Sequence, residues 1–597
     1  MPVYRAPVRD CRFILEDVLR LDRFAHHPRF ASAAPEVTVA ILEEAGRFAG
    51  EVLAPLNQGG DAQGCTRRED GSVATPLGFR EAYAAFTAGG WPSLTGPAAF
   101  GGQELPAVLG FIADEFWAGA NLAFSLYPML SSGAINALMA SGSPEQQATY
   151  VPKLVSGEWT GTMNLTEPHC GTDLGQIRTR AEQQADGSFR ITGTKIFISS
   201  GEHDLAGNIV HLVLARTPDA PPSTKGISLF VVPKFLVGDD GSLGARNAVV
   251  CGGIEEKMGI HGNATCTMNY DGATGWLIGE ENKGLAAMFI MMNAARLGVG
   301  IQGLSQAAVA YQNGVAYALD RRQGRASRPS AQGSGPDPII VHPDVRRLLM
   351  DARASTEGLR ALCLWVAVNV DLAEDGSGED GERARDLVAL LTPVIKAHGT
   401  DIAFRVAADM QQVWGGHGYI VENGMEQFVR DARITQIYEG TNGIQALDLV
   451  ARKLPAKGGQ ALRAFLALVD EEVATASDEA VAPVAECLGK AAGELKAATL
   501  WLMRHAAEDP DQVAAAAYPT MTLTGVVALG LMWLRMARAA AAALAGGAED
   551  RAFYEAKLVT ARHYAASALL DAGALRRRIE AGAGTLMALP AEEFARG

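Results

Sequence analysis

The spacing of apolar residues along the chain predicts where helices give way to strands. In the first 158 residues apolar side chains recur at helical spacing, as in Leu15, Val18 and Leu19, which places them on one helix face. Residues 160–276 instead hold short runs of Val, Ile, Thr and Phe between Gly, Asp and Pro, such as 189–199 and 209–216. Such runs are typical of strands and turns. We therefore expect a helical lobe followed by a β segment.

Helical spacing returns at Gly284 and continues to about Arg452. A stretch from Gln323 to Pro338, rich in Gly, Ser and Pro, interrupts it and is predicted to be a surface loop. After Pro455 an Ala- and Leu-rich tail strongly favours helix. The chain is too long for one ordinary core. The predicted domains are an N-terminal helical domain (1–159), a β domain (160–277), a helical-bundle domain (278–454) and a C-terminal helical extension (455–597).

Charge and cysteine content narrow the classes of function. The formal net charge of −15 disfavours nucleic acid as a partner. Seven cysteines without a CxxC pair suggest neither a disulfide framework nor a metal site. The first ten residues mix charges and prolines, unlike a secretory signal. The strongest apolar run, 523–534, is shorter than the ~20 residues that cross a bilayer. We therefore expect a cytoplasmic protein with no integral membrane segment.

Glu439 is the first candidate for chemistry. It precedes Gly440 and Thr441 and follows a helical pattern, so its carboxylate can be aimed into a pocket from a turn. The neighbours Tyr438 and Ile444 are large and apolar enough to desolvate it. Desolvation raises the pKa of a carboxyl group and makes it a better base near neutral pH. For an arbitrary glutamate, a solvated surface position is the commoner outcome.

Several motifs around Glu439 resemble those of the acyl-CoA dehydrogenase family. The segment Tyr438 to Thr441, preceded by Arg430 to Ile434, is similar to the family signature. Three further segments match in the expected order: Met163 to Asp173, Gly193 to Gly201 and Gln412 to Tyr419. The resemblance covers roughly residues 33–452. The long tail resembles a subgroup that includes 3-(methylthio)propanoyl-CoA dehydrogenases and some broad fatty acyl-CoA enzymes.

This resemblance implies a fold, a cofactor and a reaction. The fold is mainly α with a central β domain: a helical domain, a β-barrel-like domain and a four-helix-bundle domain, here followed by the extension. FAD is implied as the cofactor. The implied FAD contacts are Leu165, Thr166, Gly171, Thr172, Phe197, Ser199, Arg321, Gln412, Gly415, Gly416 and Thr441, of which Gln412 to Gly416 are implied to touch the FAD of a neighbouring subunit. The implied substrate contacts are Thr172, Asn293, Arg296 and Gly440, although Arg296 fits a helix arginine paired with a carboxylate equally well.

The sequence departs from the family pattern at four places. Phe197 stands where tryptophan is common, which keeps an aromatic face but removes an indole N–H. Pro343 stands where a glutamine is common, and His417 where many relatives carry asparagine. The motif around Arg321 is one position short before Gly324. We assign His417 no catalytic role.

One apparent motif is rejected. Residues 298–303 fit the letters G-x-G-x-x-G, but a dinucleotide fingerprint joins a strand to a helix. These glycines lie inside a helical pattern with no strand before it. We expect them to permit close packing of helices instead.

The resemblance implies a complete reaction. Glu439 takes the α proton of an acyl-CoA, the β hydride goes to the flavin, and a trans-2-enoyl-CoA forms. The implied partners are the acyl-CoA substrate and electron-transferring flavoprotein, in a homodimer or homotetramer. One alternative is an acyl-CoA oxidase; another is a nucleic-acid-binding flavoprotein of the same fold, for which the tail offers only Arg576 to Arg578 as a basic cluster. For the tail we favour a contact within the oligomer over a membrane-surface helix.

Overall fold

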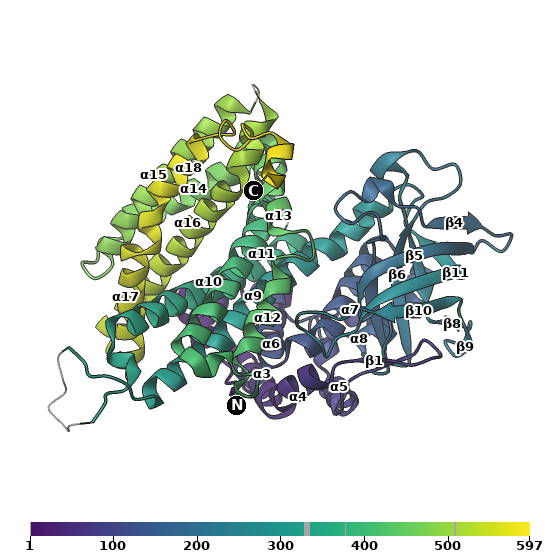
Figure 1. Cartoon of the computed structure of the whole chain (residues 1–597), viewed down its shortest axis with the longest axis horizontal. Helices are drawn as coiled ribbons and strands as arrows, with labels where there is room; N and C mark the ends of the chain where they lie inside the picture. Colours follow the sequence, from purple (N-terminus) through teal and green to yellow (C-terminus); the bar gives the residue numbers. More distant parts are fainter. Residues whose placement is uncertain (1, 328–334, 377, 507–508, 597) are drawn as a thin grey trace. The chain divides into compact units, whose positions relative to one another are not determined.

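The computed structural model describes residues 2–327, 335–376, 378–506 and 509–596. The chain forms two compact units: unit 1 comprises Met1–Val39 and Val299–Gly597, and unit 2 comprises Ala40–Gly298. Helices α3 (Pro35–Phe48) and α9 (Gly284–Asp320) run from one unit into the other. The expected order of helical, β and helical segments is confirmed (Figure 1).

Unit 2 combines a helical layer with a β-sheet. Its helices are α4 (Ala54–Gln63), α5 (Phe79–Ala88), α6 (Ala107–Ala120), α7 (Leu122–Ser141) and α8 (Pro144–Val155). Its strands are β1 (Thr66–Arg67), β2 (Val73–Ala74), β3 (Trp159–Asn164), β4 (Arg180–Gln183), β5 (Phe189–Ser199), β6 (Asn208–Ala215), β7 (Ser228–Pro233), β8 (Phe235–Val237), β9 (Leu243–Arg246), β10 (Val249–Ile254) and β11 (Thr265–Ile278).

The main sheet has seven strands in the order β3-β6-β7-β11-β5-β4, with β10 paired to β11. The β3–β6 pair is parallel and the other pairs are antiparallel. Strand β6 is buried along its whole length because it lies between β3 and β7. Val210, Leu212 and Leu214 enter the core shared with α7 and α8, whereas Val213 and Ala215 enter a second core. This alternation follows from side chains pointing to opposite faces of a strand.

Unit 1 is helical in the residues described. Apart from α9 and short turns, its helices are α1 (Val8–Phe13), α2 (Pro28–Ala31), α10 (Pro343–Asp375), α11 (Glu379–Val413), α12 (Met425–Thr435), α13 (Asn442–Asp448), α14 (Gln460–Ala474), α15 (Ala482–His505), α16 (Pro510–Ala545), α17 (Arg551–Ala566) and α18 (Ala572–Glu580). Helices α10 and α11 pack along each other, and α12 and α13 pack on α11.

The tail packs directly on the bundle. Helix α16 contacts α10, α11 and α13 as well as the tail helices α15, α17 and α18. Trp533 of α16 is fully buried, and its indole Nε1 donates a 2.9 Å hydrogen bond to the Ala354 carbonyl of α10. The tail therefore shares a core with residues of the predicted bundle domain.

The glycines rejected as a dinucleotide motif lie inside α9, as expected. A Cβ added at Gly300 would come within 2.3 Å of the Ile395 side chain of α11, and one at Gly303 within 3.2 Å of the Gly399 backbone. These two glycines therefore allow α9 and α11 to approach closely.

The predicted loop between Gln323 and Pro338 is closed at its base. The Gln323 N–H donates to the Asp337 carbonyl at 3.0 Å, and the Asp337 N–H donates to the Gly324 carbonyl at 2.9 Å. Residues 328–334 of the predicted loop lie outside the described residues.

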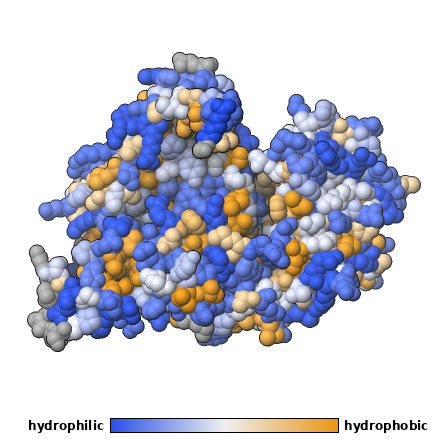
Figure 2. All heavy atoms as spheres, viewed as in Figure 1, coloured by the Kyte–Doolittle hydropathy of each residue, from blue (hydrophilic) through white to orange (hydrophobic). Residues whose placement is uncertain are grey.

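Among the residues that the structure describes, four helices, α7, α9, α11 and α16, are long and apolar enough to cross a membrane by length and composition. For α16 this corrects the expectation from the 12-residue run at 523–534, because the helix extends over 36 residues. Between 61% and 78% of each apolar window is buried inside the fold. On the face drawn in Figure 2, hydrophobic residues form patches separated by hydrophilic residues.

Candidate functional site

Glu439 lies in a tight turn between α12 and α13. Its φ is 57°, and that of Gly440 is 85°, so two consecutive residues are left-handed. For a glutamate this conformation costs about 1–3 kcal/mol and persists only where the surroundings impose it. The Glu439 side chain is partly buried. The preceding Tyr438 anchors the turn, since its hydroxyl donates to the Gln302 side chain of α9.

Lys396 of α11 is the main internal support of this turn. Its side chain is fully buried, and Nζ donates hydrogen bonds to the Gly440 carbonyl at 2.8 Å and to Asn442 Oδ1 at 2.9 Å. Gln445 adds a 3.0 Å bond from Nε2 to the Glu439 carbonyl. These bonds fix the carbonyl groups of the turn. Sequence reasoning missed Lys396; the available signal was a lysine inside the mostly apolar stretch 390–397.

The Asn442 side chain links the turn to Asp401 on the next helical turn of α11. Asn442 is 4% exposed, and its Nδ2 lies 2.8 Å from Asp401 Oδ1. Asp401 was also missed, because a solvated helix aspartate is the ordinary reading of its sequence context.

The predicted residues Gln412, Gly415 and Gly416 lie together at the end of α11, and all three are exposed. A Cβ added at Gly415 or Gly416 would meet nothing within 4 Å, and Gly415 has a φ of 57°. The backbone here is therefore open to close approach by a ligand. Thr441, also exposed, precedes α13 as its N-cap residue.

His417 belongs to an aromatic group beside these glycines. Trp414 stacks on Tyr317 with ring centroids 4.3 Å apart, and the Tyr317 hydroxyl lies 2.7 Å from His417 Nδ1. Arg321 follows the end of α9 and is exposed. Pro343 is the first residue of α10, where a missing N–H is tolerated.

Unit 2 brings the other predicted flavin contacts together. The Ile196 N–H donates to the Thr166 carbonyl at 2.9 Å, and Thr162 Oγ1 donates to the Ser199 carbonyl at 2.8 Å. These bonds join β3 and the loop that follows it to strand β5. Phe197 lies on β5 with a φ of 58° and is 59% exposed, so its ring is presented outward. In the loop, Gly171 and Thr172 are exposed and Leu165 is buried.

A buried ion pair holds this loop, and sequence reasoning missed it. Lys195 Nζ lies 2.8 Å from Glu167 Oε1 and 3.0 Å from the Leu165 carbonyl. Burial lowers the pKa of Lys195 to about 8. Burial also acts to raise the pKa of Glu167, but the Lys195 charge and hydrogen bonds from Thr179 and Arg178 outweigh it and hold that pKa below its usual value. The pair fixes the loop from its inner side.

Glu167 also belongs to a set of possible metal ligands. Ligand atoms of Glu167, His169 and Cys170 lie within 4.8 Å of one another. The Lys195 ammonium already supplies a positive charge to this carboxylate. We therefore assign Glu167 to the ion pair.

The two predicted substrate contacts on α9 have different surroundings. Asn293 is exposed, whereas Arg296 is 6% exposed. The Arg296 guanidinium carbon lies 6.0 Å from the centre of the Phe289 ring. Its burial fits both readings of Arg296, as a helix arginine and as a substrate contact.

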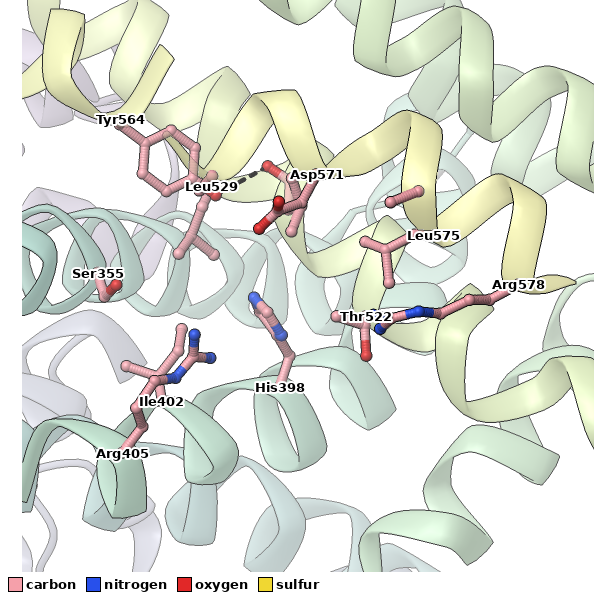
Figure 3. Close-up of a pocket in the computed structure, with 13 residues that line it drawn as sticks. Ser355, His398, Ile402, Arg405, Thr522, Leu529, Tyr564, Asp571, Leu575 and Arg578 are labelled. Carbon is pink, nitrogen blue, oxygen red and sulfur yellow. Dashed lines mark hydrogen bonds between the residues drawn. The ribbon is translucent and has the colours of Figure 1, made fainter. Parts of the chain in front are cut away.

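A cavity of about 230 Å³ lies in unit 1 between α10, α11 and the tail helices (Figure 3). His398, Arg405, Asp571 and Arg578 are among the residues that line it. Burial is the main cause that lowers the pKa of His398 to about 4. None of the residues predicted for the flavin or the substrate lines this cavity.

Family models match the chain in four successive segments. The acyl-CoA dehydrogenase N-terminal domain matches residues 35–158, the middle domain 162–273 and the C-terminal domain 282–454. A model described as acetyl-CoA dehydrogenase C-terminal like matches residues 464–590.

Curated relatives match over nearly the whole chain. A 3-methylmercaptopropionyl-CoA dehydrogenase from Ruegeria pomeroyi is 45% identical over 96% of this chain and 98% of its own length. A broad-specificity linear acyl-CoA dehydrogenase from Mycobacterium tuberculosis is 35% identical, with 100% of both chains covered.

Solved structures share the fold at lower identity. Caenorhabditis elegans ACDH-11 in complex with C11-CoA aligns with a TM-score of 0.78 at 19% identity, covering 98% of this chain and 95% of that one. A Bacillus anthracis acyl-CoA dehydrogenase complexed with FAD aligns with a TM-score of 0.73 at 20% identity, covering 94% and 89%.

Proposed function

The chain belongs to the acyl-CoA dehydrogenase family, and from this premise we propose that Glu439 is the base that removes the α proton of an acyl-CoA thioester. Membership makes the protein an FAD-dependent oxidoreductase that acts on acyl-CoA. The observation that carries the proposal for Glu439 is its left-handed turn, held by Lys396 and Gln445. Strained backbone of this kind clusters at active sites, where it aims a side chain.

The residues present fit an FAD molecule. The exposed Phe197 ring offers an aromatic face, and Gly415 and Gly416 offer open backbone with no neighbour within 4 Å of an added Cβ. We propose that Leu165, Thr166, Gly171, Thr172, Phe197, Ser199, Arg321, Gln412, Gly415, Gly416 and Thr441 hold the cofactor. When bound, FAD supplies the acceptor for the β hydride.

The remaining chemistry falls to residues of the chain. The Glu439 carboxylate accepts the α proton, and the Glu439 N–H donates to the thioester oxygen, where negative charge develops. Thr172, Asn293, Arg296 and Gly440 are the proposed substrate contacts. The four predicted domains remain part of this proposal: the β domain (160–277) contacts flavin and acyl-CoA, and the bundle domain (278–454) carries the base.

The test is anaerobic reduction of the bound flavin by acyl-CoA. Glu439→Gln removes the base while keeping the shape of the side chain, so the rate of bleaching should fall by at least ~10²-fold with FAD still bound. The control is Glu422→Gln, which changes an exposed glutamate between α11 and α12, and its flavin should bleach at the wild-type rate. Unchanged bleaching in Glu439→Gln would assign the base to another residue.

For the acyl group we propose 3-(methylthio)propanoyl-CoA, with a medium- or long-chain fatty acyl-CoA as the alternative. The support is the Ruegeria pomeroyi relative, named for 3-methylmercaptopropionyl-CoA. Comparison of kcat/KM over a panel of straight-chain acyl-CoAs and the sulfur-containing thioester tests this choice. A clear preference for a long straight chain would favour the alternative.

We further propose that the electrons pass to electron-transferring flavoprotein, and that the enzyme is a cytoplasmic homodimer or homotetramer. Reduction of that flavoprotein, driven by acyl-CoA, should outpace formation of peroxide in air. Rapid stoichiometric peroxide would instead indicate an acyl-CoA oxidase. Light scattering of the purified holoenzyme tests the oligomeric state.

A further inference from the structure

A tyrosine of the tail reaches the network under the Glu439 turn. The Tyr518 hydroxyl of α16 donates a 2.6 Å hydrogen bond to Asp401 Oδ2 of α11. Burial and the nearby Asp401 charge raise the pKa of Tyr518, so the phenol is protonated and acts as a donor near neutral pH. Helix α16 also packs against α13, which begins directly after the turn.

The other oxygen of Asp401 faces the turn. Asp401 Oδ1 accepts from Gln436 Nε2 at 2.7 Å and from Asn442 Nδ2 at 2.8 Å. These two partners lie on either side of Glu439 in sequence. Their backbones are also joined, since the Asn442 N–H donates to the Gln436 carbonyl at 3.1 Å. Asp401 therefore holds both ends of the segment that carries the proposed base.

We propose that Asp401 is a positioning residue for the Glu439 turn, and that the tail contributes to the active site through Tyr518, which holds Asp401. This inference rests on the proposed role of Glu439. It gives the C-terminal extension a specific task in the reaction: α16 fixes one carboxylate oxygen so that the other meets both ends of the turn.

The charge of Asp401 and the burial of Asn442 support a positioning role for Asp401 over a general role in stability. A carboxylate accepts hydrogen bonds through both oxygens, and bonds to a charged group are stronger than neutral ones. Asn442 is 4% exposed, so breaking its bond to Asp401 disturbs a buried network that also includes Lys396. Because small displacements of a catalytic group lower the rate strongly, loss of this network should affect turnover more than binding.

The test uses Tyr518→Phe, Asp401→Ala and the double variant as FAD-bound full-length enzymes. Tyr564→Phe is the matched control, because it removes a buried tail hydroxyl that bonds the Val526 carbonyl within the tail at 3.0 Å. Tyr518→Phe should lower kcat roughly 3- to 10-fold with KM and FAD content unchanged. If the hydroxyl acts through Asp401, Tyr518→Phe should have no further effect in the Asp401→Ala enzyme.

A conservative variant adds a second readout. Asp401→Asn keeps an oxygen for Gln436 and Asn442, so it should recover part of the kcat lost in Asp401→Ala. The inference is overturned if Tyr518→Phe has wild-type kcat, if its effect is fully additive with Asp401→Ala, or if Tyr564→Phe loses as much. Failure of the proposed base would show separately, as full flavin bleaching by Glu439→Gln.

Discussion

Lys396 is buried completely within α11, and its Nζ donates hydrogen bonds to the Gly440 carbonyl and to the amide oxygen of Asn442. Lys396→Met keeps the length of the side chain and removes both bonds to the turn. We expect kcat to fall ~10- to 100-fold. The Gly440 carbonyl loses its hydrogen bond, so the Glu439 carboxylate is no longer held in one orientation. The free energy of unfolding should fall by about 1–3 kcal/mol, since two buried acceptors of the turn lose their donor.

Stopped-flow reduction of the flavin and urea unfolding measure the two effects separately. Lys490→Met is the control, because its exposed ammonium pairs with the equally exposed Glu486 on the surface of α15. A Lys396→Met enzyme that unfolds at lower urea but reduces its flavin at the wild-type rate would contradict a role in aiming Glu439.

Two histidines of unit 2 are buried in their neutral form, and we therefore predict that the folded protein loses stability in acid. His203 and His211 are each 1% exposed, and burial lowers the pKa of both to about 3. The unfolded chain has the ordinary value of 6.5. Between these values the unfolded state binds more protons, so stability present above pH 6.5 is lost as pH falls toward 3. The slope should approach about 1.4 kcal/mol per pH unit for each histidine.

Urea unfolding followed by tryptophan fluorescence between pH 7 and pH 5 measures this slope. His211→Phe keeps a ring against Tyr270, which His211 contacts edge to face, and should flatten the pH dependence. An unchanged slope in His211→Phe would show that other groups cause the acid sensitivity.

At the scale of elements, the crossing of α9 and α11 depends on glycine. At Gly300 a Cβ would lie 2.3 Å from the Ile395 side chain and 3.1 Å from its carbonyl oxygen. Gly300→Ala should therefore overpack the crossing and destabilise the protein by about 1–3 kcal/mol. The control is Gly493→Ala in α15, where nothing lies within 4 Å of an added Cβ. Here alanine should stabilise by about 0.5–1 kcal/mol, since it favours helix more than glycine does. Thermal unfolding of both variants decides between a packing role and a neutral position.

Some of the strands, turns and contacts in the structure could be predicted from the sequence, and others could not. The run 189–199 coincides with β5, because β-branched and aromatic residues bounded by turns leave little choice of structure. The turn at Glu439 was expected from Gly440, and its left-handed backbone agrees. Lys195, Lys396 and Asp401 were not foreseen. Their partners lie 28 to 117 residues away in sequence, and no local pattern reports such contacts. The 36-residue length of α16 does not follow from the apolar run 523–534, because the helix continues into Ala-rich flanks on both sides of that run.

At the scale of the molecule, the tail is part of unit 1. A buried network ties it to both the first helix and the bundle: Lys557 of α17 bonds Asp10 of α1 and Glu357 of α10, and Arg360 bonds the same Asp10. Burial would raise the pKa of Asp10, but the charges of Lys557 and Arg360 outweigh it and hold that pKa below its usual value. Removing one member of such a network leaves a buried charge unpaired, which is strongly destabilising. The tail therefore stabilises the fold of unit 1, in addition to holding Asp401 through Tyr518.

We therefore predict that the chain does not form a folded, FAD-bound enzyme when the tail is removed. A chain ending after Leu454 loses α14 to α18 and exposes the faces of α10 and α11 that α16 covers, including the site where Trp533 packs on Gly358. We expect it to be insoluble or to bind no FAD after purification. A chain ending after Thr585 is the control, because the residues it lacks are mostly exposed; it should keep wild-type FAD content and melting temperature. Recovery of the shorter chain as a folded, FAD-bound enzyme would show that the extension folds apart from the bundle. Turnover by that chain would, in addition, remove the need for Tyr518 at the Glu439 turn.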